Sequence, residues 1–551
     1  MPRFMKTQSD FSKGETAADF CARGAAGALA LLLNAEITES GSIARRRGLT
    51  GVADLPGAAV LASFGAEYLL AITASAVRVY KNNAPVQTLA VSWGVADIAE
   101  IRWAERMDEM VFTHRDMRPK VLRKSGAAFA IADFQFETNA NWTPIIPFMH
   151  YPDTDGITLT LSAHSNGTNW ATITASAAMF GAGCVGGQIK CIGMILTITD
   201  FISETKVVAY GPNSFAMPSA AVRDWTESAW SDWRGWPASA AFFQDRLVFG
   251  GCRAWPCGLW FSKTGKHRNF DAGTGLDDEA IFITLMSDAQ QKIQNCAAGR
   301  DLIVMTDSGE WAVSANPLTP SSISARQHSS IGTAAERFVQ PQKIGAGTAF
   351  ASKDGGVAEI ALDELGENYA ALDLTLTARH LAASPVSLCW SASRSQLFAV
   401  MPDGTMAVMT KVPALGLAAW ARFATEGRFA SAACVGGEIY AAVKRGDAWS
   451  LERFADDSTE DFSFRVESAP LIIDGHHPRR VRVNRASARV EGARHIKLCG
   501  HDFYFDAPRG GDISAAVLGT GDSTGPLWAI ESSERHPVKI ISATSEGNYE
   551  L

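Results

Sequence analysis

Two acidic clusters are the part of this chain that comes nearest to a catalytic pattern. Asp277–Glu279 are three consecutive acidic residues in a Gly-rich polar loop, and Asp307 is followed closely by Glu310. Glycoside hydrolysis needs two carboxyl groups that face each other across the scissile bond. The first cluster is more typical of a solvated or calcium-binding turn. The second has the character of a structural turn, and this turn is found only once in the chain. We therefore expect no catalytic residues, with a glycan-degrading enzyme as an alternative interpretation.

Other catalytic and metal-binding motifs are missing from the sequence. There is no Gly-x-Ser-x-Gly elbow, no His-Glu-x-x-His pair and no Gly-rich phosphate loop, and the eleven histidines are dispersed. The nine cysteines form no Cys-x-x-Cys pair and no zinc-ligand spacing. They are Cys21, Cys184, Cys191, Cys252, Cys257, Cys296, Cys389, Cys434 and Cys499. The sequence predicts no cofactor, no metal and cysteines buried in a reducing compartment.

Short runs of β-forming residues fill most of the chain. Val77–Tyr80, Leu302–Met305 and Ile439–Val443 are examples, each bounded by turn residues. Hairpin signals lie at Asn82-Asn83, Ser125-Gly126, Asp307-Ser308-Gly309, Asp354-Gly355-Gly356, Asp403-Gly404 and Gly436-Gly437. A hairpin unit every ~40–50 residues is typical of β-propeller blades. A set of β-sandwiches is the competing interpretation.

The hairpin rhythm is interrupted in two places. Ile157–Leu161 and Trp170–Thr174 alternate apolar with polar residues, which predicts a small inserted β domain. From about Phe454 the chain is more charged, and the alternation of Val481–Val490 predicts a C-terminal β module. Near the start, Asp19–Asn34 is rich in Ala and Leu behind an Asp cap, which predicts one helix.

The expected fold is therefore all-β: a β-propeller core with an inserted β domain, a C-terminal β module and a short N-terminal helix. Residues 1–50 are expected to form the helix and a docking segment, and residues 51–140 the first blades. Residues 141–235 are expected to form the inserted domain, residues 236–453 the remaining blades and residues 454–551 the C-terminal module.

Several short motifs stand out along the chain, and their order is informative. They are Phe11–Glu15, a segment ending at Asn34, Gly41–Gly48, Asp108–His114, Pro119–Arg123, Trp230–Pro237, Asp245–Gly250, Ala378–Leu381 and Ala419–Phe423. In this order the motifs resemble those of the tail tubular (nozzle) proteins of short-tailed bacteriophages. Each motif is short, and the resemblance extends over most of the chain. Arg47 occupies the position of a proline that is usual in that family.

The resemblance implies a structural subunit rather than an enzyme. It implies a homohexameric ring below the portal and adaptor ring, through which genome DNA passes without sequence-specific binding, and to which tail fibres or spikes attach. The expected localisation is the tail of the virion, after synthesis in the host cytoplasm, with no membrane insertion. A receptor-binding adhesin is a further alternative, although no heptad run or glycine-periodic shaft is present.

The balance of charge argues against a protein that grips nucleic acid by charge alone. The net charge is −8, and such binding needs a surplus of Lys and Arg. Under the resemblance, candidate channel or subunit-interface residues are Arg45, Arg46, Arg47, Arg115, Arg118, Lys120 and Arg123. Solvated faces or salt bridges to neighbouring subunits are the favoured interpretation, because Asp108, Glu109 and Asp116 lie beside the second run.

A tryptophan-rich stretch ends the predicted inserted domain. It contains Trp225, Trp230, Trp233 and Trp236. Flat aromatic faces can stack on glycans, but large rings also fill joints between domains or between subunits. We interpret these residues as aromatics that pack at the joint between the inserted domain and the next blade.

Overall fold

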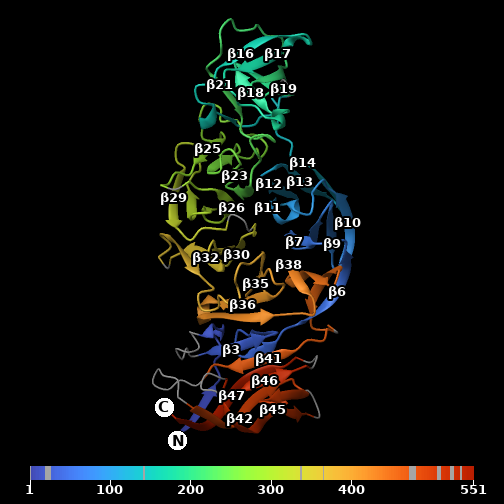
Figure 1. Ribbon diagram of the computed structural model, residues 1–551, viewed down its shortest axis with the longest axis vertical. Coiled ribbons are helices and arrows are strands. Elements are labelled where there is room, and N and C mark those ends of the chain that lie inside the picture. The colour runs from blue at the N-terminus through green and yellow to red at the C-terminus, as the bar shows by residue number, and fades with distance from the viewer. Residues whose placement is uncertain are drawn as a thin grey trace. The chain divides into compact units, whose positions relative to one another are not determined.

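The computed structural model describes residues 2–18, 27–139, 143–288, 290–334, 338–363, 365–458, 460–470, 480–505, 510–521, 526–533 and 537–550. The chain divides into two compact units, which are considered separately. Unit 1 comprises Met1–Ile98, Pro341–Ala361 and Leu372–Leu551, and unit 2 comprises Ala99–Gln340 and Leu362–Ala371. In both units the regular structure is almost entirely antiparallel β-sheet, as the sequence predicts (Figure 1).

Unit 1 contains a series of antiparallel sheets in which strands that follow each other in sequence pair through hairpins. One sheet has β7 (Ala59–Phe64), β8 (Tyr68–Thr73), β9 (Ala76–Lys81) and β10 (Ala84–Ala90). The next two series are β30 (Gln342–Ile344), β31 (Gly347–Ala351) and β32 (Val357–Leu362), then β34 (Ser387–Ser391), β35 (Gln396–Val400), β36 (Met406–Val412) and β37 (Leu417–Phe423). The first strands of neighbouring sheets pack together, β30 on β34 and β34 on β38 (Arg428–Val435), which in turn packs on β7. This arrangement of antiparallel meanders is that of propeller blades.

The blade that starts with β38 is completed by a strand from near the N-terminus. It contains β38, β39 (Glu438–Arg445), β40 (Ala448–Ala455) and β6 (Gly48–Leu55). β6 runs antiparallel to β40, with Gly48 opposite Ala455 and Leu55 opposite Trp449. The predicted boundaries at residues 50/51 and 453/454 therefore fall inside two paired strands of one blade.

Unit 2 contains three further blades of the same kind. The first has β11 (Arg102–Arg106), β12 (Glu109–His114), β13 (Met117–Ser125) and β14 (Ala128–Asp133). The second has β22 (Ser239–Phe243), β23 (Arg246–Gly250), β24 (Gly258–Phe261) and β25 (Ile281–Thr284). The third has β26 (Ile293–Ala298), β27 (Leu302–Thr306), β28 (Glu310–Ser314) and β29 (Ser324–Ser329). The first strands again pack side by side, β11 on β22 and β22 on β26. The β-propeller prediction is confirmed in both units.

A separate seven-stranded sheet interrupts the blades of unit 2. Its order is β15 (Phe148–Met149), β21 (Trp225–Ser228), β18 (Gln188–Cys191), β19 (Met194–Ser203), β20 (Lys206–Tyr210), β17 (Gly167–Ala175) and β16 (Leu159–His164). Short 3-10 turns, η2 (Pro152–Thr154) and η3 (Ala182–Cys184), lie between its strands. The sheet has its own core, which includes Leu159, Ile173 and Trp225. It lies within the residues 141–235 expected for an inserted domain, coloured teal and green in Figure 1.

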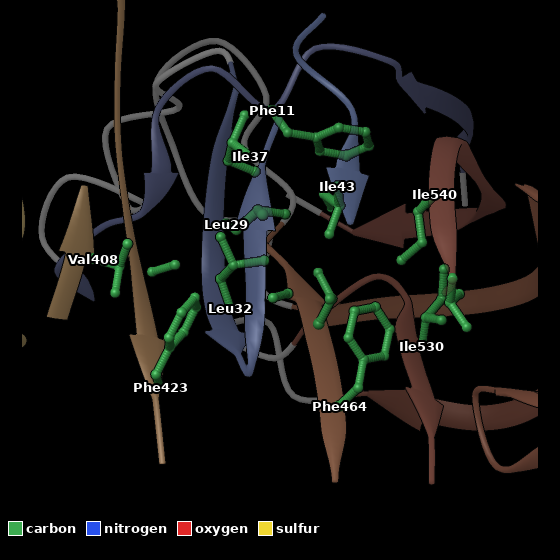
Figure 2. Packing of buried hydrophobic residues seen from close by; sticks show 14 of the residues in the cluster. Phe11, Leu29, Leu32, Ile37, Ile43, Val408, Phe423, Phe464, Ile530 and Ile540 are labelled. Carbon is green, nitrogen blue, oxygen red and sulfur yellow. The ribbon is translucent and has the colours of Figure 1, made fainter. Parts of the chain in front are cut away.

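The two ends of the chain form one module in unit 1. One sheet has the order β4 (Ala35–Ile37), β5 (Ile43–Arg45), β47 (Lys539–Glu550), β42 (Arg480–Glu491) and β45 (Gly510–Gly521), and β1 (Arg3–Gln8) also pairs with β47. The second sheet continues the β34–β37 blade through β2 (Gly14–Glu15), β3 (Ala28–Leu33), β41 (Phe464–Ser468), β46 (Ala529–Ser532), β43 (His495–Leu498) and β44 (His501–Tyr504). Phe11, Leu29, Phe423, Phe464 and Ile540 share one core between these elements (Figure 2). The predicted C-terminal module is thus built from both termini.

The predicted helix over Asp19–Asn34 is wrong in its second half. Residues 28–33 form strand β3, and residues 19–26 lie outside the described residues. β3 pairs in parallel with β2 and in antiparallel with β41, and its Leu29 and Leu32 are fully buried. A strand inside a covered sheet is apolar almost throughout, so a run of Ala and Leu suits it as well as it suits a helix.

The six predicted hairpin turns are confirmed. Asn82 and Asn83 join β9 to β10 with positive φ angles of 50° and 65°. Gly126 and Gly404, at φ 61° and 86°, occupy the turns after β13 and β35. Positive φ favours glycine and asparagine, which explains why these local signals could be read from the sequence.

Candidate interaction sites

Glu15 is a buried carboxylate that binds groups from three separate segments of unit 1. Its side chain is 1% exposed. Its oxygens accept hydrogen bonds from Leu32 N at 2.8 Å, Arg422 Nη2 at 2.8 Å and His380 Nε2 at 3.1 Å. A cavity of about 280 Å³ lies beside this cluster, lined by His380, Asp403 and Arg422 among others. The buried charge is therefore compensated from strand β37 and from the segment that carries His380.

Gly14, next to Glu15, is required by the same junction. It has φ +61°, and a Cβ atom added there would lie 2.4 Å from the carbonyl oxygen of Trp420. Gly14 pairs with Trp420 across parallel strands β2 and β37. Only a residue without a side chain permits this approach. The sequence motifs Phe11–Glu15, Ala378–Leu381 and Ala419–Phe423 thus meet at one place.

Arg46 forms a second buried junction in unit 1. Its guanidinium donates to Asn34 Oδ1 at 2.9 Å, to Glu460 Oε2 at 2.9 Å and to the Ala424 carbonyl at 2.9 Å, and it lies 3.7 Å from the ring centroid of Phe462. Burial lowers the pKa of Arg46. Burial also works against the charge of Glu460, but its bonds and proximity to Arg46 hold the pKa of Glu460 below its usual value. Motif residues Asn34 and Arg46 thus stabilise each other.

This geometry removes Arg46 from the candidate channel residues. Its side chain has 0% exposure, so it can face neither a channel nor a neighbouring subunit. The other six candidates have partners within their own unit. Arg45 donates to Phe462 O and Arg118 to Phe134 O; Arg47 pairs with Asp456, Lys120 with Asp133, Arg123 with Glu109 and Arg115 with Glu100. The expected salt bridges to neighbouring subunits stay a prediction, whereas Arg47, Lys120, Arg123 and Arg115 each lie beside a carboxylate of their own chain.

The four tryptophans of the stretch occupy different environments. Trp225 is 2% exposed and belongs to the core of the inserted sheet, where its Nε1 donates to Ile157 O at 2.9 Å. Trp230 is 2% exposed and packs on Phe136, Phe249, Trp260 and Phe270 at centroid distances of 5.3–5.8 Å. Phe249 and Trp260 belong to blade strands, Phe270 to the loop between β24 and β25, and Phe136 to the segment that leads from β14 to the inserted sheet. Neither ring can offer a face to a glycan.

The other two tryptophans are more accessible. Trp233 is 40% exposed, and its ring covers Gly181, where an added Cβ would lie 2.2 Å from ring atoms. Trp236 donates from Nε1 to Asp232 Oδ1 at 2.7 Å, and the Arg118 guanidinium lies 5.9 Å from its ring centroid. Both rings are therefore held by neighbours in unit 2.

In both acidic clusters, carboxylates are engaged by groups of the chain itself. The Glu279 carboxylate accepts hydrogen bonds from the backbone N–H groups of Thr274, Gly275 and Leu276 at 2.6–2.9 Å. The loop also surrounds Arg246, whose guanidinium donates to the carbonyls of Asp277 and Glu279. Two backbone carbonyls of this loop are thus bound by the guanidinium of Arg246. Glu310 is fully buried in β28, while Asp307 caps Lys292 N at 2.9 Å.

Cysteines and histidines form no metal centre within the described ranges. No group of three or more His, Cys, Asp or Glu side chains is placed to hold a metal ion there. Cys184, Cys191, Cys252 and Cys296 are free and buried, and burial raises the pKa of each thiol to about 11 or 12. These thiols are protonated at neutral pH and pack as small apolar groups. Within the same ranges, no helix has the length and apolar character needed to cross a bilayer.

The comparisons with known proteins give only distant structural matches. No family model and no curated protein matches the chain. Solved structures that it resembles include BamB from Moraxella catarrhalis, at 12% identity, TM-score 0.34 and 75% coverage of this chain. The RRP9 WD40 repeats match at 7% identity and TM-score 0.36 over 75% of this chain. The Myceliophteria thermophila Cps50 (Swd1) β-propeller domain matches at 8% and 0.35 over 74%. Each of these three is covered over 100% of its own chain.

Some residues of the sites described above were not predicted from the sequence. Glu460, His380 and Arg422 lie far in the chain from the residues they bind, and no local pattern pairs them. The available signal was the place of Glu15, His380 and Arg422 in the ordered motifs, which Glu460 does not share.

Proposed function

We propose that this chain is a structural subunit of the tail nozzle of a short-tailed bacteriophage and has no enzymatic activity. The observation that carries the proposal is the meeting of the nozzle-like motifs in the fold. Glu15 contacts His380 and Arg422, Gly14 pairs with Trp420, and Asn34 contacts Arg46. The motifs resembled the family through their order in the sequence. In the fold, residues of these motifs bind each other in two buried junctions, as expected of residues with a structural role.

The charge distribution supports a passage for DNA rather than a DNA-binding protein. Each lysine or arginine placed against a phosphate adds salt-dependent affinity, which would retard a moving duplex. The chain carries a net charge of −8, and all seven candidate basic side chains have partners within the chain. In this proposal six copies form a ring below the portal and adaptor ring, and fibres or spikes attach to its outside. A subunit expressed alone is expected to stay monomeric until the adaptor ring templates assembly.

Immunogold labelling tests the proposal most directly. A tag is fused to the C-terminus, and intact phage particles are viewed by electron microscopy. Label confined to the tail at a single vertex would support the nozzle. Label at the tips of fibres would favour a receptor-binding adhesin, and particles without label would refute the structural role and favour a glycan-degrading enzyme released from the particle.

A further inference from the structure

A cavity of about 310 Å³ lies in unit 2, among the three blades that start with β11, β22 and β26. Three cationic side chains line it, those of Arg115, Arg253 and Lys292, together with the single carboxylate of Asp116. Ala238, Pro256 and Ile293 add an apolar wall. A volume of roughly 300 Å³ is at the lower end for small-molecule sites, which combine an apolar lining with a few polar groups.

The three cations differ in how far the chain already neutralises them. Arg253 Nη1 bonds Asp116 Oδ1 at 2.6 Å, and its Nη2 donates to the Asp232 carbonyl at 2.6 Å. Arg115 lies 4.0 Å from Glu100 and donates to Gln294 Oε1 at 3.3 Å. Lys292 is exposed, and among the described residues its ammonium group forms no ion pair, although the Asp307 carboxylate accepts a hydrogen bond from its backbone N–H at 2.9 Å. Within the lining, the positive charge is therefore least neutralised at Lys292 and Arg115.

A buried arginine, Arg102, lies near Arg115 but does not itself line the cavity. Arg102 is 2% exposed, and its Nη1 donates only to the backbone carbonyls of Glu100 and Ile101. Its Nε and Nη2 atoms are buried without hydrogen-bond partners among the described residues. The guanidinium groups of Arg102 and Arg115 each lie 4.9 Å from the ring centroid of Phe338. Burial, and then the charge of Arg115, lower the pKa of Arg102 to about 9.

A buried guanidinium without a carboxylate partner is costly, because it loses its hydration and gains little Coulomb energy in return. Glu100 is shared, since the same carboxylate also lies 3.7 Å from His114. One carboxylate thus serves two arginines and a histidine on this side of the cavity. A ligand carrying one negative group would supply the missing compensation.

We propose that this cavity is a binding site for a small ligand that bears an oxyanion group, a carboxylate or a phosphate. Lys292 and Arg115 bind the anion, and the apolar wall formed by Pro256 and Ile293 receives the rest of the ligand. The inference rests on the cavity alone and does not depend on the nozzle proposal.

The surroundings favour a single small anion over a nucleic acid. A duplex carries one charge per ~1.7 Å of its axis and needs a continuous basic track. Here Asp116 lies in the cavity wall, Glu100 beside Arg115, and Asp307 next to Lys292. These carboxylates would repel an extended polyanion more strongly than a single anionic group.

The cavity is suited to binding and not to covalent chemistry. Cys252 is the thiol in its wall, and burial raises its pKa to about 11. Its Sγ accepts a hydrogen bond from Trp255 N at 3.3 Å. A thiol of this pKa is protonated at neutral pH and is a poor nucleophile.

Titration of the full chain with three probes tests the proposal. Benzoate and phenyl phosphate carry the two anion types on a small apolar body, and benzyl alcohol is their neutral counterpart. We expect saturable binding of benzoate, of phenyl phosphate or of both by calorimetry, and none of benzyl alcohol. Binding of benzoate alone would identify a carboxylate site, and binding of phenyl phosphate alone a phosphate site.

Two variants with opposite effects make the test specific. Lys292→Met is expected to weaken binding of the active probe about 10-fold, a change of ~1.4 kcal/mol, because it removes the exposed cation. Asp116→Asn is expected to strengthen binding several-fold, because it removes the carboxylate that lines the cavity. Lys206→Met, at an exposed position of the inserted sheet, is the matched control and is expected to bind as the unaltered chain does.

Four outcomes would overturn the proposal. The first is no saturable binding of either anionic probe at millimolar concentration, and the second is equal binding of benzyl alcohol. The third is an unchanged affinity for the active probe in Lys292→Met. The fourth is that the small probes do not bind but a DNA duplex does, with an affinity that Lys292→Met abolishes. The last outcome would assign the cavity to nucleic acid instead. Circular dichroism of each variant confirms that it is folded before titration.

Discussion

The Oε1 atom of Glu15 accepts a hydrogen bond of 2.8 Å from Nη2 of Arg422, a residue 407 positions later in the chain. The bond fixes short strand β2 beside β37, the last strand of a blade. It therefore ties the module formed by the chain termini to the propeller blade of the same unit. Because the Glu15 side chain is 1% exposed, the pair is shielded from water and salt on the carboxylate side.

Substitution of Glu15 by glutamine is expected to destabilise unit 1. The change keeps the shape but removes the charge that compensates Arg422, and bonds to charged groups contribute about 1.5–3 kcal/mol each. We expect a loss of about 3 kcal/mol, because a buried charged partner is removed. Thermal unfolding measures it. Glu67→Gln is the control, since Glu67 pairs with Lys81 at an exposed site and its loss should change stability little. Equal losses of stability in the two variants would show that the buried Glu15–Arg422 pair contributes no more than an exposed ion pair.

Substitution of Gly14 by alanine tests the close approach of β2 to β37. Gly14 and Gly65 have nearly the same φ, +61° and +58°, but only at Gly14 would a Cβ meet another residue, Trp420. Gly65→Ala should cost about 1 kcal/mol for the left-handed backbone alone. Gly14→Ala should cost a further ~1–3 kcal/mol from overpacking against the Trp420 carbonyl. Thermal unfolding of both variants gives the difference, and equal losses would contradict the contact.

The parts of the fold that could be predicted from the sequence are those set by neighbours in the chain. Hairpin turns need positive φ at one or two residues, so Asn82-Asn83 and Gly126 signal them directly. The ion pair between Glu109 and Arg123 belongs to the same local class, since both lie on adjacent strands of one hairpin. Such pairs follow from the strand register once the turn is known.

The parts that could not be predicted depend on residues far apart in sequence. The pairing of β6 with β40, which places Gly48 opposite Ala455, has no local signal. The same holds for the bond between Arg46 and Glu460 and for the burial of Arg102. The error at β3 has a related cause, because the apolar run at 28–33 gives no sign of the strands that cover it.

Glu310 is expected to make stability depend on pH. It lies fully buried in β28, and burial raises its pKa. A carboxyl whose folded pKa is raised contributes stability that is complete below the unfolded pKa, about 4.3, and that is lost as pH rises through the folded pKa. Glu310→Gln cannot ionise, so its stability relative to the unaltered chain should be greater at pH 8 than at pH 5.

Thermal unfolding at the two pH values measures this difference. Glu204→Gln, at an exposed position between β19 and β20, is the control and should show the pH dependence of the unaltered chain. A stability difference for Glu310→Gln that is the same at pH 5 and pH 8 would mean that Glu310 does not titrate in this range.

The tryptophan stretch gives a last prediction, which separates packing from glycan stacking. Trp230→Ala removes a buried ring that contacts Phe249 at 5.3 Å and Trp260 at 5.4 Å, and it is expected to cost about 3–5 kcal/mol. Trp233→Ala removes a ring that is 40% exposed, so its cost should be clearly smaller. Thermal unfolding with limited proteolysis of unit 2 measures both. If Trp233→Ala destabilised the chain as much as Trp230→Ala, the exposed ring would also have a packing role. If Trp233→Ala left stability unchanged but abolished binding to host glycans, stacking would be its function.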